Sequence, residues 1–369
     1  MKSEGYTDQD WLERMYRKSN STRTKRIAAT SLHTFEIFCK AQNMTKQQMI
    51  EKYQYRFNQS KPDIRSICLS LDKFVKFLDA DNDSIGLNNI RFQFKRKNPK
   101  TIKTYFSFVK SYLRLCHGVK ISSEDIADYV QFPKARKEPR QPVSLEQLKA
   151  IMNYASPKRK ALYYVLLTSG MRLGEALTLT KRNIHIDEKP VRITLEAENT
   201  KTKEGRETYI SSEAFEKLKP FLQGKGNDDL LFCNTSDLDL TVQNEDHRFA
   251  LIRIKLGFTE KYRNSNRHVV NLHSFRAYFH TKASQKHGDE YANALDGHSS
   301  YLPQYYREDP KERAKKYLEL EPSLLIESVK FEADQVNAKL MSDMQDQLVK
   351  MQDEIDRLKK YPQAELLTQ

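Results

Sequence analysis

The sequence places arginine and histidine side chains at spacings that suit the binding of a phosphodiester. The stretch "TSGMRLGEAL" holds Arg172 shortly after a glycine, where a helix can begin, with Glu175 one turn further on. In "LHSFR", His273 and Arg276 stand at positions i and i+3, so both side chains leave one helix face. A third stretch, "DGHSS", presents His298 directly after a glycine. Each motif alone is common in a basic protein, and only their combination and order favour a joint site.

The chemistry expected of this set is the exchange of DNA strands without a metal. Arg172 and Arg276 can offset the charge of a pentavalent phosphorane with fixed, bidentate donors, and the histidines can donate to a phosphate oxygen or move a proton. Tyr301, Tyr305 and Tyr306 follow in "HSSYLPQYYRED". A phenol, with an ordinary pKa of about 10, becomes nucleophilic once such cations stabilise its anion. The resulting 3′-phosphotyrosine keeps the energy of the broken bond, so neither ATP nor any other cofactor is expected.

In this order, the stretches resemble the tyrosine recombinase family, the lambda-type integrases and chromosome-dimer resolvases. That family carries an Arg in a "TGhRhsEhhxL" stretch, then a hairpin Lys, then "HxLR", "GH" and a Tyr. The first element here, "TSGMRLGEALTL", matches at Gly170, Arg172, Glu175, Leu177 and Leu179. "NTKTKEGRE", "LHSFRAYF" and "DGHSS" follow in the correct order, so the resemblance covers about residues 144–307.

The resemblance implies a role for individual residues. The implied catalytic set is Arg172, Lys201, His273, Arg276, His298 and Tyr306, with Glu175 as a supporting partner of Arg172 or of the helix start. A lysine at a hairpin tip would protonate the leaving 5′ oxygen. Lys201 sits where the family's lysine usually sits, and Lys203 is the alternative.

The nucleophile is chosen by its spacing from the histidine of "GH". Tyr306 lies closest to the family's usual distance after His298, Tyr305 is the alternative, and Tyr301 is expected to pack or to contact the DNA backbone. The ending "GHSSYLPQYYR" also looks like that of archaeal-type members, in which the later tyrosine attacks.

Two residues depart from the family pattern. Phe275 replaces the usual Leu of "HxLR", a mild change in packing. Asp296 precedes the glycine of "GH", where an apolar residue is usual, and it is expected to hydrogen-bond a neighbouring turn or His298.

An excess of basic residues favours a polyanionic partner. The 63 Lys and Arg outnumber the 49 Asp and Glu, which gives a formal charge of +14. Double-stranded DNA is the expected partner, and an anionic membrane is the second choice. Basic clusters mark the first domain and the linker after it, and the candidate DNA-binding residues are Arg23, Lys25, Arg26, Lys95, Arg96, Lys97, Lys100 and Lys103.

Other sequence features exclude several classes of protein. No apolar run is long enough to span a bilayer, and the polar start lacks the apolar region of a secretion signal. We therefore expect a soluble, cytoplasmic protein that acts on the nucleoid or in the interior of a host cell. The scattered cysteines, Cys39, Cys68, Cys116 and Cys233, lack zinc-ligand spacing and are expected to be buried free thiols, so no metal site is predicted.

Hydrophobic periodicity and composition divide the chain into two domains and a tail. A helical, DNA-binding (core-binding) domain is expected over residues 1–132, a proline-rich linker over 133–143, and the catalytic domain over 144–322. Heptad spacing over 323–369 predicts a coiled-coil-like helix. The predicted fold is mainly α with a small β-hairpin or sheet in the catalytic domain (α+β).

These features together predict a site-specific DNA recombinase or integrase. By resemblance, its two domains would close around duplex DNA as a clamp, and a homo-oligomer of four copies would act on two DNA sites. The alternatives are a catalytically silent protein that binds or bridges DNA, and a type IB topoisomerase-like enzyme that uses the same phosphotyrosine.

Overall fold

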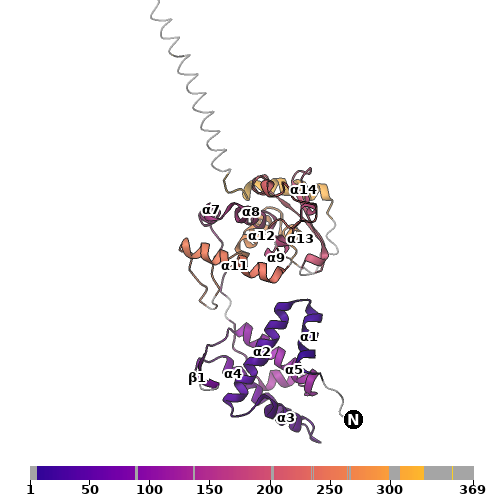
Figure 1. Cartoon of the computed structure of the whole chain (residues 1–369), viewed down its shortest axis with the longest axis vertical. Helices are drawn as coiled ribbons and strands as arrows, with labels where there is room; N and C mark the ends of the chain where they lie inside the picture. Colours follow the sequence, from indigo (N-terminus) through magenta and orange to yellow (C-terminus); the bar gives the residue numbers. More distant parts are fainter. Residues whose placement is uncertain are drawn as a thin grey trace, which may run out of the picture. The chain divides into compact units, whose positions relative to one another are not determined.

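The chain forms two compact units. The structure is a computed structural model, and it describes residues 6–87, 90–135, 138–200, 203–233, 235, 237–263, 265, 267–298, 308–327 and 351. One unit comprises Met1–Pro139 with Lys261–Arg267, and the other comprises Arg140–Glu260 with His268–Gln369. Figure 1 traces both units and labels their main helices.

The described residues of the first unit form six helices and one two-stranded hairpin. The helices are α1 (Asp8–Ser19), α2 (Thr22–Ala41), α3 (Lys46–Phe57), α4 (Ile64–Leu78), α5 (Pro99–His117) and α6 (Ser123–Tyr129). The predicted apolar faces of α4 and α5 are confirmed, because the residues that define them, Ile67, Leu71, Phe74, Leu78, Ile102, Phe106, Val109 and Leu113, are all buried. Helix α5 ends at Gly118, which adopts a left-handed conformation with φ of 73°.

The hairpin of the first unit was not predicted from the sequence. Strands β1 (Asn82–Leu87) and β2 (Ile90–Phe94) pair antiparallel, with Leu87 opposite Ile90. The first domain was expected to be helical, and this hairpin is an addition to the predicted helices. Part of the basic cluster around Lys95 follows a strand, whereas Lys100 and Lys103 lie in the first turns of α5.

Aromatic side chains form the centre of the first unit. Phe35 and Phe38 of α2 contact Phe74 of α4, and each of these two ring pairs has a centroid distance of 5.3 Å. Trp11 of α1 is fully buried against Tyr112 of α5, at a centroid distance of 5.5 Å. Edge and tilted ring contacts of this kind add to the burial energy of the rings, so these contacts stabilise the packing of α2 on α4 and of α1 on α5.

The second unit is also mainly helical. Its helices are α7 (Leu145–Tyr154), α8 (Pro157–Ser169), α9 (Leu173–Leu177), α10 (Ser212–Leu218), α11 (Leu238–Lys255), α12 (His273–His287), α13 (Asp289–Asp296) and α14 (Pro310–Leu320). The capping box predicted at the start of α7 is confirmed, because Ser144 accepts from the backbone N–H of Gln147 and Gln147 accepts from that of Ser144. Helix α8 is buried continuously over residues 161–169 and packs against α10 and α12, so it forms the centre of the core.

A small antiparallel sheet completes the second unit. Its strand order is β3 (Ile184–His185), β4 (Val191–Leu195), β5 (Arg206–Ile210). Strands β4 and β5 form the predicted hairpin, and β3 adds a two-residue edge strand. Alternate residues of β4 are buried, as expected for a sheet with one face on the core. The structure thus confirms the predicted α+β fold class.

Two further expectations can be compared with the described residues. None of the helices described is both long and apolar enough to cross a bilayer. All four cysteines are free thiols, with Cys39, Cys68 and Cys233 buried and Cys116 partly buried.

Candidate active site

The C-terminal end of α13 is the centre of the candidate site. The last carbonyl groups of a helix have no partner within the helix and carry partial negative charge. Here three consecutive carbonyl oxygens each accept from a different arginine. Arg206 Nε donates to Leu295 at 3.1 Å, Arg276 Nη1 donates to Asp296, and Arg172 Nη2 donates to Gly297 at 3.0 Å. Three guanidinium groups from three separate elements therefore meet at one helix end.

Glu175 holds two of these arginines in place. Its carboxylate is buried and accepts from Arg172 Nη1 at 2.9 Å and from Arg206 Nη2 at 2.6 Å. The backbone N–H of Arg172 also donates to Glu175, at 2.9 Å, because Glu175 occupies the third position of α9. Burial acts to raise the pKa of Glu175, but the hydrogen bonds and charges of Arg206 and Arg172 together hold it below its usual 4.5. The carboxylate is thus charged at neutral pH.

Arg276 is the most deeply placed of the three arginines. Its side chain is 2 % exposed, and Nη1 also donates to the carbonyl oxygen of Gly170 at 2.6 Å. Burial lowers the pKa of Arg276 to about 10, although the nearby Asp296 carboxylate opposes that shift. The guanidinium therefore stays protonated at neutral pH. Its Nε is buried and has no hydrogen-bond partner in the described part of the chain.

Gly170 permits the close approach that brings these elements together. It ends α8 with φ of +66°, a conformation that L side chains rarely adopt. A Cβ atom at this position would lie 2.3 Å from Cδ1 of Phe279 and 3.0 Å from Cβ of Asp296. The glycine of "TSGMR" is therefore required both by the turn and by its contacts with α12 and α13.

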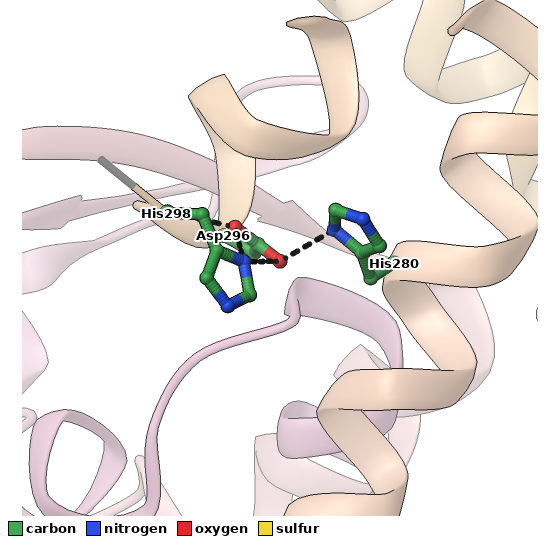
Figure 2. A group of neighbouring side chains, drawn as sticks. All are labelled: His280, Asp296 and His298. Atoms are coloured by element: carbon green, nitrogen blue, oxygen red, sulfur yellow. Dashed lines mark hydrogen bonds and ion pairs between the residues drawn. The ribbon is translucent and has the colours of Figure 1, made fainter. Parts of the chain in front are cut away.

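Asp296 joins two histidines beside the arginines. His298 Nδ1 lies 2.8 Å from Oδ2 of Asp296, and His280 Nδ1 lies 2.9 Å from the same oxygen. Figure 2 shows the carboxylate between the two imidazole rings. The backbone N–H of His298 donates to Oδ1 at 3.0 Å, and Arg276 Nη2 lies 3.3 Å from Oδ1. The predicted hydrogen bond between Asp296 and His298 is present, and it explains why an acid stands where an apolar residue is usual.

The environment of His298 favours its neutral form. Burial lowers the pKa of His298 below 6.5, and the nearby Arg276 acts in the same direction, whereas Asp296 opposes the shift without cancelling it. The side chain is 48 % exposed, so one edge of the ring is open. A neutral imidazole that donates from Nδ1 carries its lone pair on Nε2.

Of the remaining candidate catalytic residues, only His273 and Lys203 lie within the described part of the chain. His273 is exposed in the first turn of α12, one turn before Arg276. Lys203 has a positive φ of 60°, and its Nζ donates to the carbonyl oxygen of Glu198 at 3.0 Å within the same loop. Lys201 lies outside the described residues, and so do the three candidate tyrosines, Tyr301, Tyr305 and Tyr306.

Two residues of the site were missed by sequence reasoning. Arg206 opens β5 and reaches α13 from 89 positions earlier in the chain, a contact that no local pattern predicts. His280 stands four residues after Arg276 on α12, and side chains at that spacing share a helix face. That spacing is the signal that could have identified His280. Together with Asp296 and His298 it forms a group whose possible ligand atoms all lie within 4.8 Å of one another.

The predicted DNA-binding residues lie at two helix starts and beside the hairpin of the first unit. Arg23 and Arg26 are exposed near the start of α2, and Lys100 and Lys103 are exposed near the start of α5. Neither helix has an acidic residue in its first turn. Cations at this end of a helix are electrostatically unfavourable, whereas an anion there is stabilised. A phosphate would relieve the repulsion.

Three of the other predicted DNA-binding residues have partners or ring contacts within the unit. Lys25 pairs with Glu13, and Arg96 Nε lies 2.9 Å from Asp79. The ammonium group of Lys97 lies 4.6 Å from the ring centroid of Phe94, whereas Lys95 is exposed.

Comparison with known proteins defines the class of this site. Residues 142–311 match the model of the phage integrase family, and this span includes every candidate catalytic residue from Arg172 to Tyr306. Residues 142–311 are thus similar to the phage integrase family, and the protein is a tyrosine site-specific recombinase.

Two relatives extend the match beyond the catalytic part. Tyrosine recombinase XerC of Chlamydia caviae is 24 % identical over 293 residues, which cover 75 % of this chain and 88 % of that protein. Tyrosine recombinase XerA of Saccharolobus solfataricus is 23 % identical over 232 residues, which cover 57 % of this chain and 72 % of that protein. Among solved structures, a lambda integrase dimer bound to a COC′ core site is 14 % identical, with a TM-score of 0.49, covering 82 % of this chain and 79 % of that one.

Proposed function

We propose that this recombinase cuts and rejoins double-stranded DNA through a 3′-phosphotyrosine on Tyr306, with Arg172 and Arg276 as the phosphate clamp. The observation that carries the proposal is the donation of Arg276 and Arg172 to the consecutive carbonyl oxygens of Asp296 and Gly297. Both cations are thereby fixed near His298, which precedes the candidate tyrosines in the sequence.

The two arginines divide the work of charge stabilisation. Arg172 is partly exposed, with 26 % of its side chain accessible, so it can meet a non-bridging phosphate oxygen from the surface. Arg276 carries a buried Nε without a partner in the described part of the chain, and a phosphate oxygen would satisfy that donor. Fixed donors aimed at developing charge stabilise a transition state without reorganisation. A buried donor without a partner also carries a desolvation cost that the substrate would remove.

Histidine and lysine side chains carry out the proton transfers in this proposal. His298, neutral and with the Nε2 lone pair on its open side, would take the proton of the attacking phenol. His273 would donate to the phosphate from the exposed start of α12. Lys201 would protonate the leaving 5′ oxygen, since the ammonium group of Lys203 is already held by the carbonyl oxygen of Glu198.

The active assembly is proposed to be a homo-tetramer on two DNA sites. Residues 1–132 would form the core-binding domain, residues 133–143 the linker and residues 144–322 the catalytic domain. The heptad helix proposed for residues 323–369 lies almost wholly outside the described residues. We also propose that the protein acts in the cytoplasm, on the nucleoid or in the interior of a host cell. We further propose that it is an archaeal-type member, as the ending of its motif favours.

A covalent trapping assay tests the proposed nucleophile. Nicked duplexes of random sequence, labelled so that the 3′-phosphotyrosine side is detected, should give a denaturation-resistant adduct with the wild type. Tyr306→Phe should give none, because only the phenolic oxygen of Tyr306 attacks. Tyr305→Phe is the matched control and should keep the adduct.

The opposite pattern would assign the attack to Tyr305. If the wild type binds these duplexes but traps none of them, the protein binds or bridges DNA without cutting it, and the proposed reaction is wrong.

A further inference from the structure

His280 is a half-buried histidine that the proposed chemistry does not use. It lies on α12, one turn after Arg276, and its Nδ1 is 2.9 Å from Oδ2 of Asp296. Asp296 is fully buried at the end of α13, and His298 follows it by two residues. The three side chains therefore form a chain from α12 through the carboxylate to the ring of His298, as Figure 2 shows.

The hydrogen-bond requirements of the carboxylate determine which ring nitrogens carry protons. An ionised carboxylate only accepts, and a fully buried one is costly unless donors satisfy it. Nδ1 of His280 and Nδ1 of His298 are the imidazole atoms within 3 Å of it. Each ring can therefore donate from Nδ1 to Asp296. Arg276 Nη2 lies 3.3 Å from both Nδ1 of His298 and Oδ1 of Asp296, and in this arrangement it donates to the carboxylate. The lone pair of His298 is then on Nε2, away from the carboxylate.

A metal ion fits this cluster less well than two hydrogen bonds from the protonated Nδ1 atoms of His280 and His298 to Asp296. Zinc would need both Nδ1 atoms deprotonated and would sit beside Arg276, whose Nη2 lies 3.3 Å from Oδ1 of Asp296. Arg172 and Arg206 add positive charge at the same helix end. Placing a divalent cation among three guanidinium groups is electrostatically unfavourable, so the geometry favours a hydrogen-bonded bridge.

We propose that His280 is a positioning residue, which acts through Asp296 to hold His298 in the Nδ1–H tautomer with Nε2 presented to the substrate. The assignment rests on the proposed role of His298 as proton acceptor. Without His280, Oδ2 of Asp296 loses a donor and the carboxylate can rotate. His298 can then turn or adopt the other tautomer, in which Nε2 carries a proton and cannot accept one.

Three variants separate positioning from general stability. His280→Ala removes the donor while installing the best helix-forming residue. His280→Asn restores an N–H close to the position of Nδ1, although asparagine is a poorer helix former than alanine. His287→Ala is the matched control, since His287 lies on the same helix and its Nε2 is 2.8 Å from the carbonyl oxygen of Lys316, a bond that does not involve Asp296.

The first measurement needs no DNA. Histidine-selective ¹⁵N NMR of the full chain, with the His298 signals identified by their loss in His298→Gln, reports the tautomer of each of the nine histidines. We expect His298 to carry its proton on Nδ1 in the wild type, in His280→Asn and in His287→Ala, and to become a mixture of tautomers in His280→Ala. A wild-type His298 protonated on Nε2 overturns the inference, whatever the protein does to DNA.

The second measurement is the rate of adduct formation on the nicked duplexes. We expect His280→Ala to slow the reaction about tenfold, less than the roughly hundredfold or greater loss from removing a general base itself. His280→Asn should recover most of the rate, and His287→Ala should keep it. Equal rates for the wild type and His280→Ala would refute the positioning role while leaving the recombinase reaction intact, whereas no adduct from the wild type would refute the proposed reaction.

A thermal melt with zinc chloride or a chelator tests the alternative occupant. The inference predicts the same melting temperature in both conditions for the wild type. A zinc-dependent rise that is present in the wild type and absent in His280→Ala would identify a metal site and overturn the inference.

Discussion

Glu175 couples the charge of the site to its stability. Its carboxylate contacts Arg172 and Arg206, and both arginines also donate to the end of α13. Removal of one member of a buried ionic network leaves an uncompensated buried charge. The free-energy cost of that charge exceeds the net stabilisation that the intact network provides. Glu175 is therefore a structural requirement for placing the arginines.

We expect Glu175→Gln to lower the free energy of unfolding by about 3 kcal/mol at neutral pH. Glu188→Gln is the control, because its partner Arg192 forms a more exposed pair whose loss should cost less than about 1 kcal/mol. Urea unfolding at neutral pH measures both. Equal effects of the two substitutions would show that the buried Glu175 network contributes no more to the free energy of unfolding than the exposed pair does.

The same variant predicts a dependence on pH. The folded-state pKa of Glu175 lies below 4.5, so its contribution to stability is present above the unfolded-state pKa and is lost as pH falls through the folded value. The difference between the wild type and Glu175→Gln should therefore shrink as pH falls below about 4.5. A difference that stays constant across that range would contradict this assignment.

At the scale of elements, the turn between α8 and α9 sets the geometry of the site. Gly170 lies against Phe279 of α12 and Asp296 of α13, and its carbonyl oxygen receives Arg276. The turn therefore fixes the distance between α8 and the two elements that carry Arg276 and His298.

We expect Gly170→Ala to destabilise the second unit by about 2–5 kcal/mol, because left-handed strain costs about 1–2 kcal/mol and the displaced Phe279 adds about 1–3 kcal/mol. Gly257→Ala is the control. Gly257 has a similar φ of +73° in the same unit, but a Cβ atom there would meet nothing within 4 Å. Thermal unfolding should show a clearly larger loss for Gly170→Ala, and equal losses would mean that strain alone matters.

Local sequence signals predicted the elements better than the contacts between them. The apolar periodicity of α4 and α5, the capping box of α7 and the hairpin of β4 and β5 are all set by residues within one element or its turn. The hairpin of β1 and β2 was missed because two short strands give no period longer than a few residues. Strand β3 has only two residues and is defined by its partner rather than by its own sequence.

The candidate site shows the same division between local and long-range information. Arg172, Glu175, Arg276 and His298 were identified from short motifs, and contacts join them directly or at the same helix end. Arg206 and the role of Asp296 depend on contacts with the end of α13 and with α12. Such contacts are set by tertiary packing, which a single sequence does not encode in any local pattern.

At the scale of the whole molecule, the positive charge is arranged for a polyanion. The starts of α2 and α5 hold exposed arginines and lysines without acidic neighbours in the first turn. Lys25 and Arg96, by contrast, already pair with acids of their own unit. The exposed arginines and lysines at the starts of α2 and α5, which form no ion pair among the described residues, should therefore contribute most of the phosphate contacts.

We expect replacement of Arg23, Arg26 and Lys100 by alanine to flatten the salt dependence of DNA binding. Loss of three phosphate contacts reduces the slope of log K against log salt by roughly 2 to 3. The control replaces Lys52, Lys61 and Lys73, which are exposed in the same unit but outside the basic clusters. Binding to a duplex of arbitrary sequence over a salt series gives both slopes, and equal flattening would mean that net charge alone governs binding.

The structural role of the arginines at the end of α13 affects which residues a related protein can lose during evolution. Arg172, Arg206 and Arg276 donate hydrogen bonds to the final carbonyl groups of a helix. This structural role does not depend on the binding of a phosphate. A lineage that gave up strand cleavage could discard its tyrosine freely but would lose a helix cap by discarding an arginine. In a distant relative, the presence of these arginines would then indicate only that the fold is retained. The presence of the tyrosine would be the better indicator that strand cleavage is retained.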